Sequence, residues 1–158
     1  MGNVLTTSIC NTVVNTLRTI PALGSGVVQK PGEMTEGITD EPTVQVYPEE
    51  VKPVTPSGAT ERTSFGTSNH DKMKRQHDIT VHIDLYARMR HELNEDMAAL
   101  LDLIDPIEEK LEEQSVKPYF GLAGLQAFSW TSSRVIFVYG DPEIKYVGWR
   151  WVLTFRVF

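Results

Sequence analysis

The segment that decides the fold is His77-Asp-Ile-Thr-Val-His-Ile-Asp-Leu-Tyr86, in which apolar and polar residues alternate. The apolar residues on one side of an extended chain are Ile79, Val81, Ile83 and Leu85. The residues on the other side are Thr80, His82, Asp84 and Tyr86. Side chains of a β-strand point alternately to its two faces. The segment therefore predicts a strand with one buried face and one polar face.

A helical pattern follows this strand. Its apolar residues recur at spacings of three and four, which is the period of an amphipathic helix; they are Met89, Leu93, Met97, Leu100, Leu101, Ile104, Ile107 and Leu111. Pro106 interrupts the pattern, with Asp105 as an N-cap before it and Glu108 close behind. The sequence predicts either two consecutive helices or one helix sharply kinked at Pro106.

The C-terminal third has the residue pattern of β-strands. It predicts strands at 125–130, 133–139 and 145–157, the last two joined by Gly140-Asp-Pro-Glu143. One face of the last strand is apolar and carries Trp149, Trp151, Leu153, Phe155 and Val157. The opposite face carries Arg150, Thr154 and Arg156.

The N-terminal part predicts one helix, one linker and one strand. Residues 4–20 place an apolar stripe at helical spacing, with Cys10 expected as a small buried residue. Residues 24–40 are small and polar without a sustained period, which is typical of a loop or linker. Residues 43–47 alternate and are rich in β-branched side chains, so they predict a strand that Pro48 closes, with an irregular extension over 51–54 left as an alternative.

These elements predict a single domain of the α+β class, a mainly antiparallel β-sheet with helices packed on one face. Residues 1–20 form its N-terminal helix, 21–41 an arm or linker, and 42–158 the α+β core. That core contains a long loop at 56–76, which is polar and contains glycine. Connections of this length inside a compact domain are either functional or disordered. The predicted order is helix, strand, loop, strand, helix and three strands.

Composition narrows the classes of function. The 158 residues are 41% hydrophobic and 23% charged, as in a globular protein. The net charge of −6 argues against a protein whose task is to bind nucleic acid tightly. It is compatible with a protein that lines a channel through which DNA passes. The single cysteine excludes an intrachain disulfide and a thiolate zinc site. No apolar run approaches the roughly 20 residues that span a bilayer, so no membrane partner is predicted.

The most enzyme-like feature is the pair His82 and Asp84, which share one strand face and could hold a divalent metal. His77 has the opposite parity, and His91 lies beyond the strand. No metalloprotease, phosphate-loop or dinucleotide-binding spacing is present. We therefore interpret the pair as part of a solvent or interface face, and predict no catalytic residue, cofactor or metal. The remaining interface candidates are Phe65 in the long loop and the basic cluster Lys72, Lys74 and Arg75.

Several segments and their order resemble the tail terminator proteins of long-tailed bacteriophages. The likeness lies in the N-terminal helix, in Pro42-Thr-Val-Gln-Val-Tyr47, in the strand 77–86, and in the proline-interrupted helical region 88–114. It continues in Trp130-Thr-Ser-Ser-Arg-Val-Ile-Phe-Val-Tyr-Gly-Asp-Pro-Glu143 and in Trp149-Arg-Trp-Val-Leu-Thr-Phe-Arg-Val-Phe158. Segment 21–41 departs from the pattern.

The resemblance implies a structural virion protein and no enzyme. Such a protein forms a hexameric ring at the head-proximal end of the tail tube, ends tube polymerisation and provides the attachment surface for the head. The implied partners are copies of itself, the tail tube protein, a head–neck connector or head-closure protein, and genomic DNA passing through the lumen without specific binding. Assembly would take place in the host cytoplasm. The alternatives are another neck or baseplate adaptor protein, or a small metal-dependent enzyme.

Overall fold

The computed structural model describes residues 6–23, 27–34, 42–53, 76–89, 93–139 and 143–157. In chain order the elements are α1 (Thr6–Leu17), β1 (Val28–Gln29), β2 (Thr43–Pro53), β3 (His77–Met89), α3 (Leu93–Glu113), the short 3-10 helix η3 (Tyr119–Gly121), β4 (Leu125–Tyr139) and β5 (Ile144–Val157).

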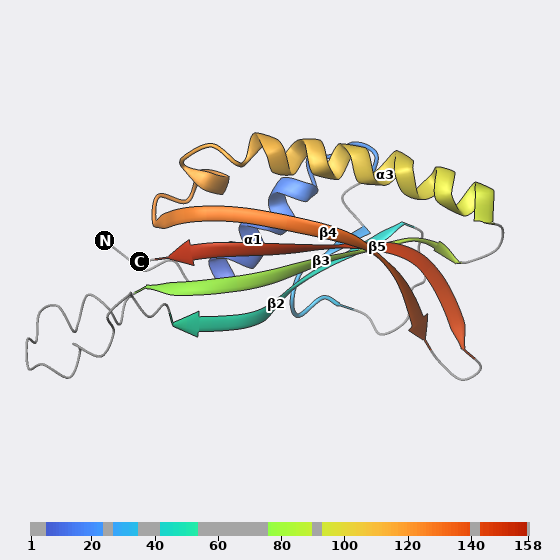
Figure 1. Ribbon diagram of the computed structural model, residues 1–158, viewed down its shortest axis with the longest axis horizontal. Helices are drawn as coiled ribbons and strands as arrows, with labels where there is room; N and C mark the ends of the chain where they lie inside the picture. Colours follow the sequence, from blue (N-terminus) through green and yellow to red (C-terminus); the bar gives the residue numbers. More distant parts are fainter. Residues whose placement is uncertain are drawn as a thin grey trace, which may run out of the picture.

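The strands form one five-stranded sheet in the order β1-β2-β3-β5-β4 (Figure 1). β1 runs parallel to β2, and all other neighbours are antiparallel. α1 and α3 lie over one face of this sheet, where their buried side chains join those of the strands in a single core. We call the opposite face the open face. The predicted α+β class, with helices on one face of a mainly antiparallel sheet, is confirmed.

The core is built by the apolar face of β3 and the apolar face of β5. Ile79, Val81, Ile83 and Leu85 are all at most 3% exposed, as the alternation of β3 predicts. Trp151 of β5 is fully buried and is paired with Ile83. Burial of a large apolar side chain contributes about 1.5–3 kcal/mol, so these central strands hold much of the stability.

α3 is one helix with Pro106 inside it, so the alternative of two consecutive helices is wrong. Leu100, Ile104, Ile107 and Leu111 keep one helical phase across the proline, and all four are buried in the core. A proline inside a helix removes one backbone hydrogen bond. Continuous burial on both sides of Pro106 offsets that loss.

The predicted strand that ends at Pro48 instead continues to Pro53, with a shift of register between Pro48 and Glu50. β1 pairs only with positions 44 and 45 of β2. Beyond those positions β2 is an edge strand in the described sheet, where a proline costs no ladder hydrogen bond on the outer side. The expected end at Pro48 is therefore wrong, and the alternative of an irregular extension over 51–54 is confirmed as far as Pro53.

The segment predicted as a loop or linker contains β1, which is a correction to its expected lack of regular structure. Leu23 and Val28 belong to the core. Arg18, just past α1, donates to the carbonyl oxygen of Val28 at 2.8 Å and to a carboxylate oxygen of Glu33 at 3.0 Å. These bonds hold the described part of this segment against the domain. The role of the remainder of 21–41 as an arm lies outside the described residues.

The two strands predicted at 125–130 and 133–139 are one continuous strand, β4. Thr131 and Ser132 were expected to separate them, yet they pair with Val152 and Trp151 of β5. Neither is a glycine or proline that would break a ladder, and threonine is well suited to a strand. The last predicted strand is confirmed as β5.

Candidate assembly surfaces

The open face carries a polar row that crosses all five strands. Asp84 of β3 is paired with Gln45 of β2 and with Arg150 of β5, and the row ends at Gln29 of β1 and Ser133 of β4. The side-chain amide of Gln45 donates to that of Gln29 at 3.0 Å. Residues far apart in the sequence are thus brought side by side by the strand order.

Asp84 is the centre of this row. Its carboxylate accepts two hydrogen bonds from Arg150, at 2.7 and 3.0 Å, and one from the Tyr47 hydroxyl at 2.7 Å. Only 3% of the Asp84 side chain is exposed, whereas 31% of the Arg150 side chain is. A buried carboxylate is stable in a fold when it is paired and hydrogen-bonded in this way.

The environment of Asp84 changes the acidity of its neighbours. Burial raises the pKa of Tyr47 above its usual value, and the hydrogen bond to the Asp84 carboxylate raises it further. The hydrogen bond to Asp84 raises the pKa of Arg150. Tyr47 thus keeps its proton and Arg150 its charge throughout the neutral range.

His82 lies beside this group on the open face. Its Nδ1 atom is 3.3 Å from the Tyr47 hydroxyl and 3.9 Å from a carboxylate oxygen of Glu49. Its ring packs edge-on against Tyr47, with centroids 5.4 Å apart. The prediction that His82 and Asp84 share a polar face is confirmed, and their contact with a partner stays a prediction. Within the described residues, no group of three His, Cys, Asp or Glu side chains could hold a metal ion.

A second arginine–carboxylate pair lies further along the same two strands. Arg156 donates to both oxygens of Asp78, at 2.9 and 3.1 Å. This pair is more exposed, with 44% of the Arg156 side chain and 29% of the Asp78 side chain accessible. Both arginines that β5 places on the open face are therefore neutralised by carboxylates of β3.

Where the sheet extends past the polar row, aromatic side chains cover the open face. Tyr86, Phe137 and Tyr146 form a small buried cluster, with the Tyr86 and Phe137 rings 4.1 Å apart. Gly148 makes this possible, because a Cβ there would collide with the Phe137 ring and with the carbonyl oxygen of Leu85. The cluster anchors the projecting hairpin of β4 and β5 to β3.

The end of that hairpin exposes apolar residues. Ile136, Val138 and Ile144 are 42%, 48% and 41% exposed. Figure 1 shows the joined ends of β4 and β5 curving away from α3. By strand register, Ile136 and Val138 lie on the side of the hairpin that continues the helical face, and Ile144 lies on the side that continues the open face. Neighbouring exposed apolar side chains such as Ile136 and Val138 mark contact surfaces.

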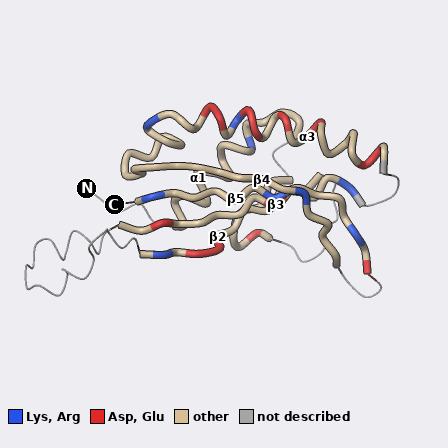
Figure 2. Tube along the Cα trace, in the orientation of Figure 1, with Lys and Arg blue, Asp and Glu red and all other residues tan. Residues whose placement is uncertain are grey.

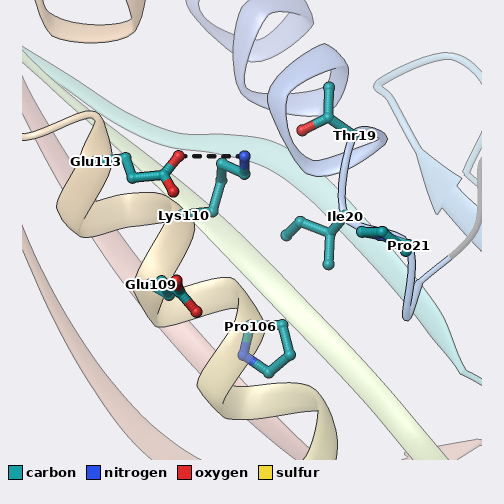
Figure 3. A pocket seen from close by; sticks show the side chains of 7 residues that line it. All are labelled: Thr19, Ile20, Pro21, Pro106, Glu109, Lys110 and Glu113. Atoms are coloured by element: carbon teal, nitrogen blue, oxygen red, sulfur yellow. Dashed lines mark ion pairs between the residues drawn. The ribbon is translucent and has the colours of Figure 1, made fainter.

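Two hollows among the described residues are small. One, shown in Figure 3, encloses about 180 Å³ between the end of α1 and α3. Its walls include Ile20, Pro106 and the ion pair of Lys110 with Glu113 at 3.2 Å. The other encloses about 90 Å³ beside Cys10, whose thiol pKa burial raises to about 11. Small-molecule sites commonly have about 300–1,000 Å³, so surfaces are better candidates for function than these hollows.

The other predicted interface residues, Phe65, Lys72, Lys74 and Arg75, lie outside the described residues, as does nearly all of the loop 56–76. Sequence reasoning missed Tyr47 and Arg150 as the partners of Asp84, because strand register is needed to find them. No described helix is both long and apolar enough to cross a membrane.

A scan of protein-family models finds none that matches this chain, and a search of curated proteins finds no match either.

Proposed function

We propose that this chain is a structural subunit that assembles with copies of itself into a ring, and that the ring terminates the tail tube of a long-tailed bacteriophage. In this proposal the ring caps the tube at its head-proximal end, stops the addition of tube subunits and offers its other side to the head. The energy for these tasks comes from interfaces between subunits, commonly on the order of 1,600 Å² each.

The observation that carries the proposal is the apolar end of the β4–β5 hairpin. Ile136, Val138 and Ile144 are each more than 40% exposed there, on a hairpin that curves away from the helical layer (Figure 1). A contact with a neighbouring subunit would remove these side chains from water at about 25 cal/mol for each Å² buried. The resemblance to tail terminators supports the identity of the assembly.

The open face supports the passage of DNA. Its two arginines on β5 are paired with Asp84 and Asp78, and they do not offer free cations to phosphates. Affinity for DNA comes mainly from unpaired Lys and Arg. An open face that lined the lumen would therefore let DNA slide past without specific binding.

The test is to image the assembled particle and to purify tubes formed with variant protein. We expect a closed ring of six copies at the head-proximal end of the tube. Changing Ile136 and Val138 together to serine should leave the isolated subunit folded and prevent capping, so that tubes grow beyond their normal length.

The matched control is Val116→Ser, because Val116 is 71% exposed and lies outside the hairpin. It should cap normally. One copy or an open helical array at this position would contradict the terminator and favour another neck or baseplate adaptor. Tubes of normal length with the hairpin variant would show that the hairpin is not the assembly surface.

A further inference from the structure

The outer edge of β4 is a long strand edge without a neighbour in the described sheet. β4 has 15 residues and pairs only with β5 among the described strands. Every second residue of such a strand directs its N–H and C=O groups outward. Apart from Gln126, the residues along this edge are serine, threonine and apolar or aromatic side chains, with Arg134 as the one charge and no proline. An edge of this kind accepts another β-strand.

The outer edge of β2 in a second copy does not fit this role. Within positions 47–53 it carries two prolines, three charged residues and a register shift. Proline and charge on an edge strand prevent pairing. β1, which covers the other end of β2, has only two residues. Among the described strands, the best available partner for β4 is therefore β4 of a second copy.

We propose that two free copies of this chain pair through their β4 edges, antiparallel, around a two-fold axis that passes between the two Ser132 residues. The axis is perpendicular to the sheet, so one sheet of ten strands results and the helices of both copies cover the same face. This inference goes beyond the ring, because a ring with only rotational symmetry has no two-fold contact between neighbours. The pair is the form of the free protein and separates when the ring closes.

This register places complementary side chains opposite each other on the helical face. Arg134 faces Trp130 of the second copy, and Ile136 faces Phe128 of the second copy. Trp130 and Phe128 are half-buried and pack against the core. A guanidinium over an indole ring is an attractive contact, and Phe128 covers the exposed Ile136. On the open face, the large Phe137 lies opposite the small Ala127.

Charge supports the same register. Arg134 is exposed and makes no ion pair with any residue that the structure describes. Glu108 of α3 accepts a hydrogen bond from the Ser132 hydroxyl at 3.1 Å, which fixes its carboxylate near the proposed axis. Arg134 of each copy then lies diagonally across from Ser132 of the other, within reach of that carboxylate. Each copy supplies one arginine and one glutamate, so the contact is self-complementary.

Glu108 of each copy lies near the axis, where the two Arg134 side chains offset its charge. The remaining acidic residues of α3 do not oppose this pairing. Figure 2 shows the acidic residues spread along α3, which packs mainly over β3 and β5. Four strand spacings would separate the two helices, about 20 Å at roughly 4.8 Å each. This exceeds the screening length of about 8 Å at physiological ionic strength.

Disulfide trapping tests the register. Ser132→Cys places two thiols opposite each other across the axis, and it should form a dimer under mild oxidation. Ser129→Cys is the matched control, because Ser129 lies on the same strand and is exposed. In this register Ser129 faces Val135 of the second copy, so the two introduced thiols do not meet. Equal cross-linking of both variants, or none with Ser132→Cys, would overturn the register.

Charge exchange tests the contact in solution. By sedimentation, the free protein should be a dimer, and Arg134→Glu should raise the dimer dissociation constant about tenfold or more, because it places like charges together. Adding Glu108→Arg to that variant should restore dimerisation. Melting temperatures of all variants check that the subunit is folded.

The two proposals fail separately. A free protein that stays monomeric at all concentrations, or a double variant that does not recover, overturns the β4 pair and leaves the ring untouched. A dimer trapped through Ser132→Cys in a protein that never caps tubes would support the pair and overturn the terminator.

Discussion

The two edges of the sheet differ in nearly every property that controls strand pairing. The outer part of β2 is short, carries Pro48 and Pro53, and shifts register after Pro48. The outer edge of β4 is twice as long, contains no proline and has Arg134 as its only charge. Native proteins block edges that must stay unpaired. This difference is the basis of our proposal that the β4 edge, and not the β2 edge, pairs with a second copy.

If β4 is kept for assembly, the central strands β3 and β5 must carry most of the stability of the fold. Substitutions there should therefore change the free energy of unfolding most. Trp151→Ala, in the central strand β5, should lower the free energy of unfolding by about 3–5 kcal/mol, because it leaves a cavity in the core. Trp151 is fully buried. Thr131→Ala on the edge strand β4 should change it by less than about 0.5 kcal/mol. Urea unfolding measures the free energy for both variants. Similar losses would show that β4 contributes as much to stability as β5, which would contradict a role of its edge in assembly alone.

The two arginine–carboxylate pairs that join β3 and β5 differ in burial, so removing their carboxylates should cost different amounts of stability. Asp84→Ala removes a nearly buried carboxylate that Arg150 and Tyr47 share. It should cost about 1–3 kcal/mol, because polar groups of both residues lose their partner. Asp78→Ala breaks the exposed pair with Arg156 and should cost less than about 1 kcal/mol. Equal losses in urea unfolding would contradict burial as the cause.

The sequence predicted the elements of the centre better than those of the edges. β3 and β5 were predicted well because both alternate cleanly and bury one face. At the edges the local signals misled. Pro48 suggested an end to the regular part of β2, and Thr131-Ser132 suggested a gap in β4. Both strands nevertheless continue, because they pair with a neighbouring strand along their length.

The candidate site was only half predictable for the same reason. Alternation alone placed His82 and Asp84 on one polar face. The partners of Asp84 lie 37 and 66 positions away in sequence, at Tyr47 and Arg150. Which residues face each other across strands depends on register, and register is set by turns and packing that a single sequence does not reveal.

Removing one proline and two charges from the outer edge of β2 should change stability little but association strongly. Replacing Pro48, Glu50 and Lys52 with threonine should change the free energy of unfolding by less than about 1 kcal/mol in total, because all three are exposed on an edge. It should also create a second pairing edge, so that sedimentation shows species larger than the wild type. Ser129→Lys with Thr131→Lys on β4 should have the opposite effect, since lysine blunts an edge. An unchanged association state in the threonine variant would mean that these residues do not keep β2 unpaired.

The smallest effect concerns Tyr47, which lies where β2 loses its outer neighbour. Burial, and then the hydrogen bond to Asp84, raise the pKa of Tyr47 in the folded protein, whereas in the unfolded chain it is about 10. Between these values the unfolded state has lost the proton and the folded state has kept it. The contribution of this hydroxyl to stability is therefore complete below about pH 10 and is lost as the pH rises above that value.

Comparison with Tyr47→Phe isolates this group, because the other lysines and tyrosines titrate alike in both proteins. The wild type should be the more stable protein at pH 8, since its hydroxyl donates to Asp84 at 2.7 Å. The difference in the free energy of unfolding should shrink steadily from about pH 10 upward, because only the wild type loses stability by this route. Urea unfolding at intervals from pH 8 to 11 measures it. A constant difference over that range would mean that the Tyr47 proton is not held by Asp84, and that the polar row does not fasten β2 to the centre of the sheet.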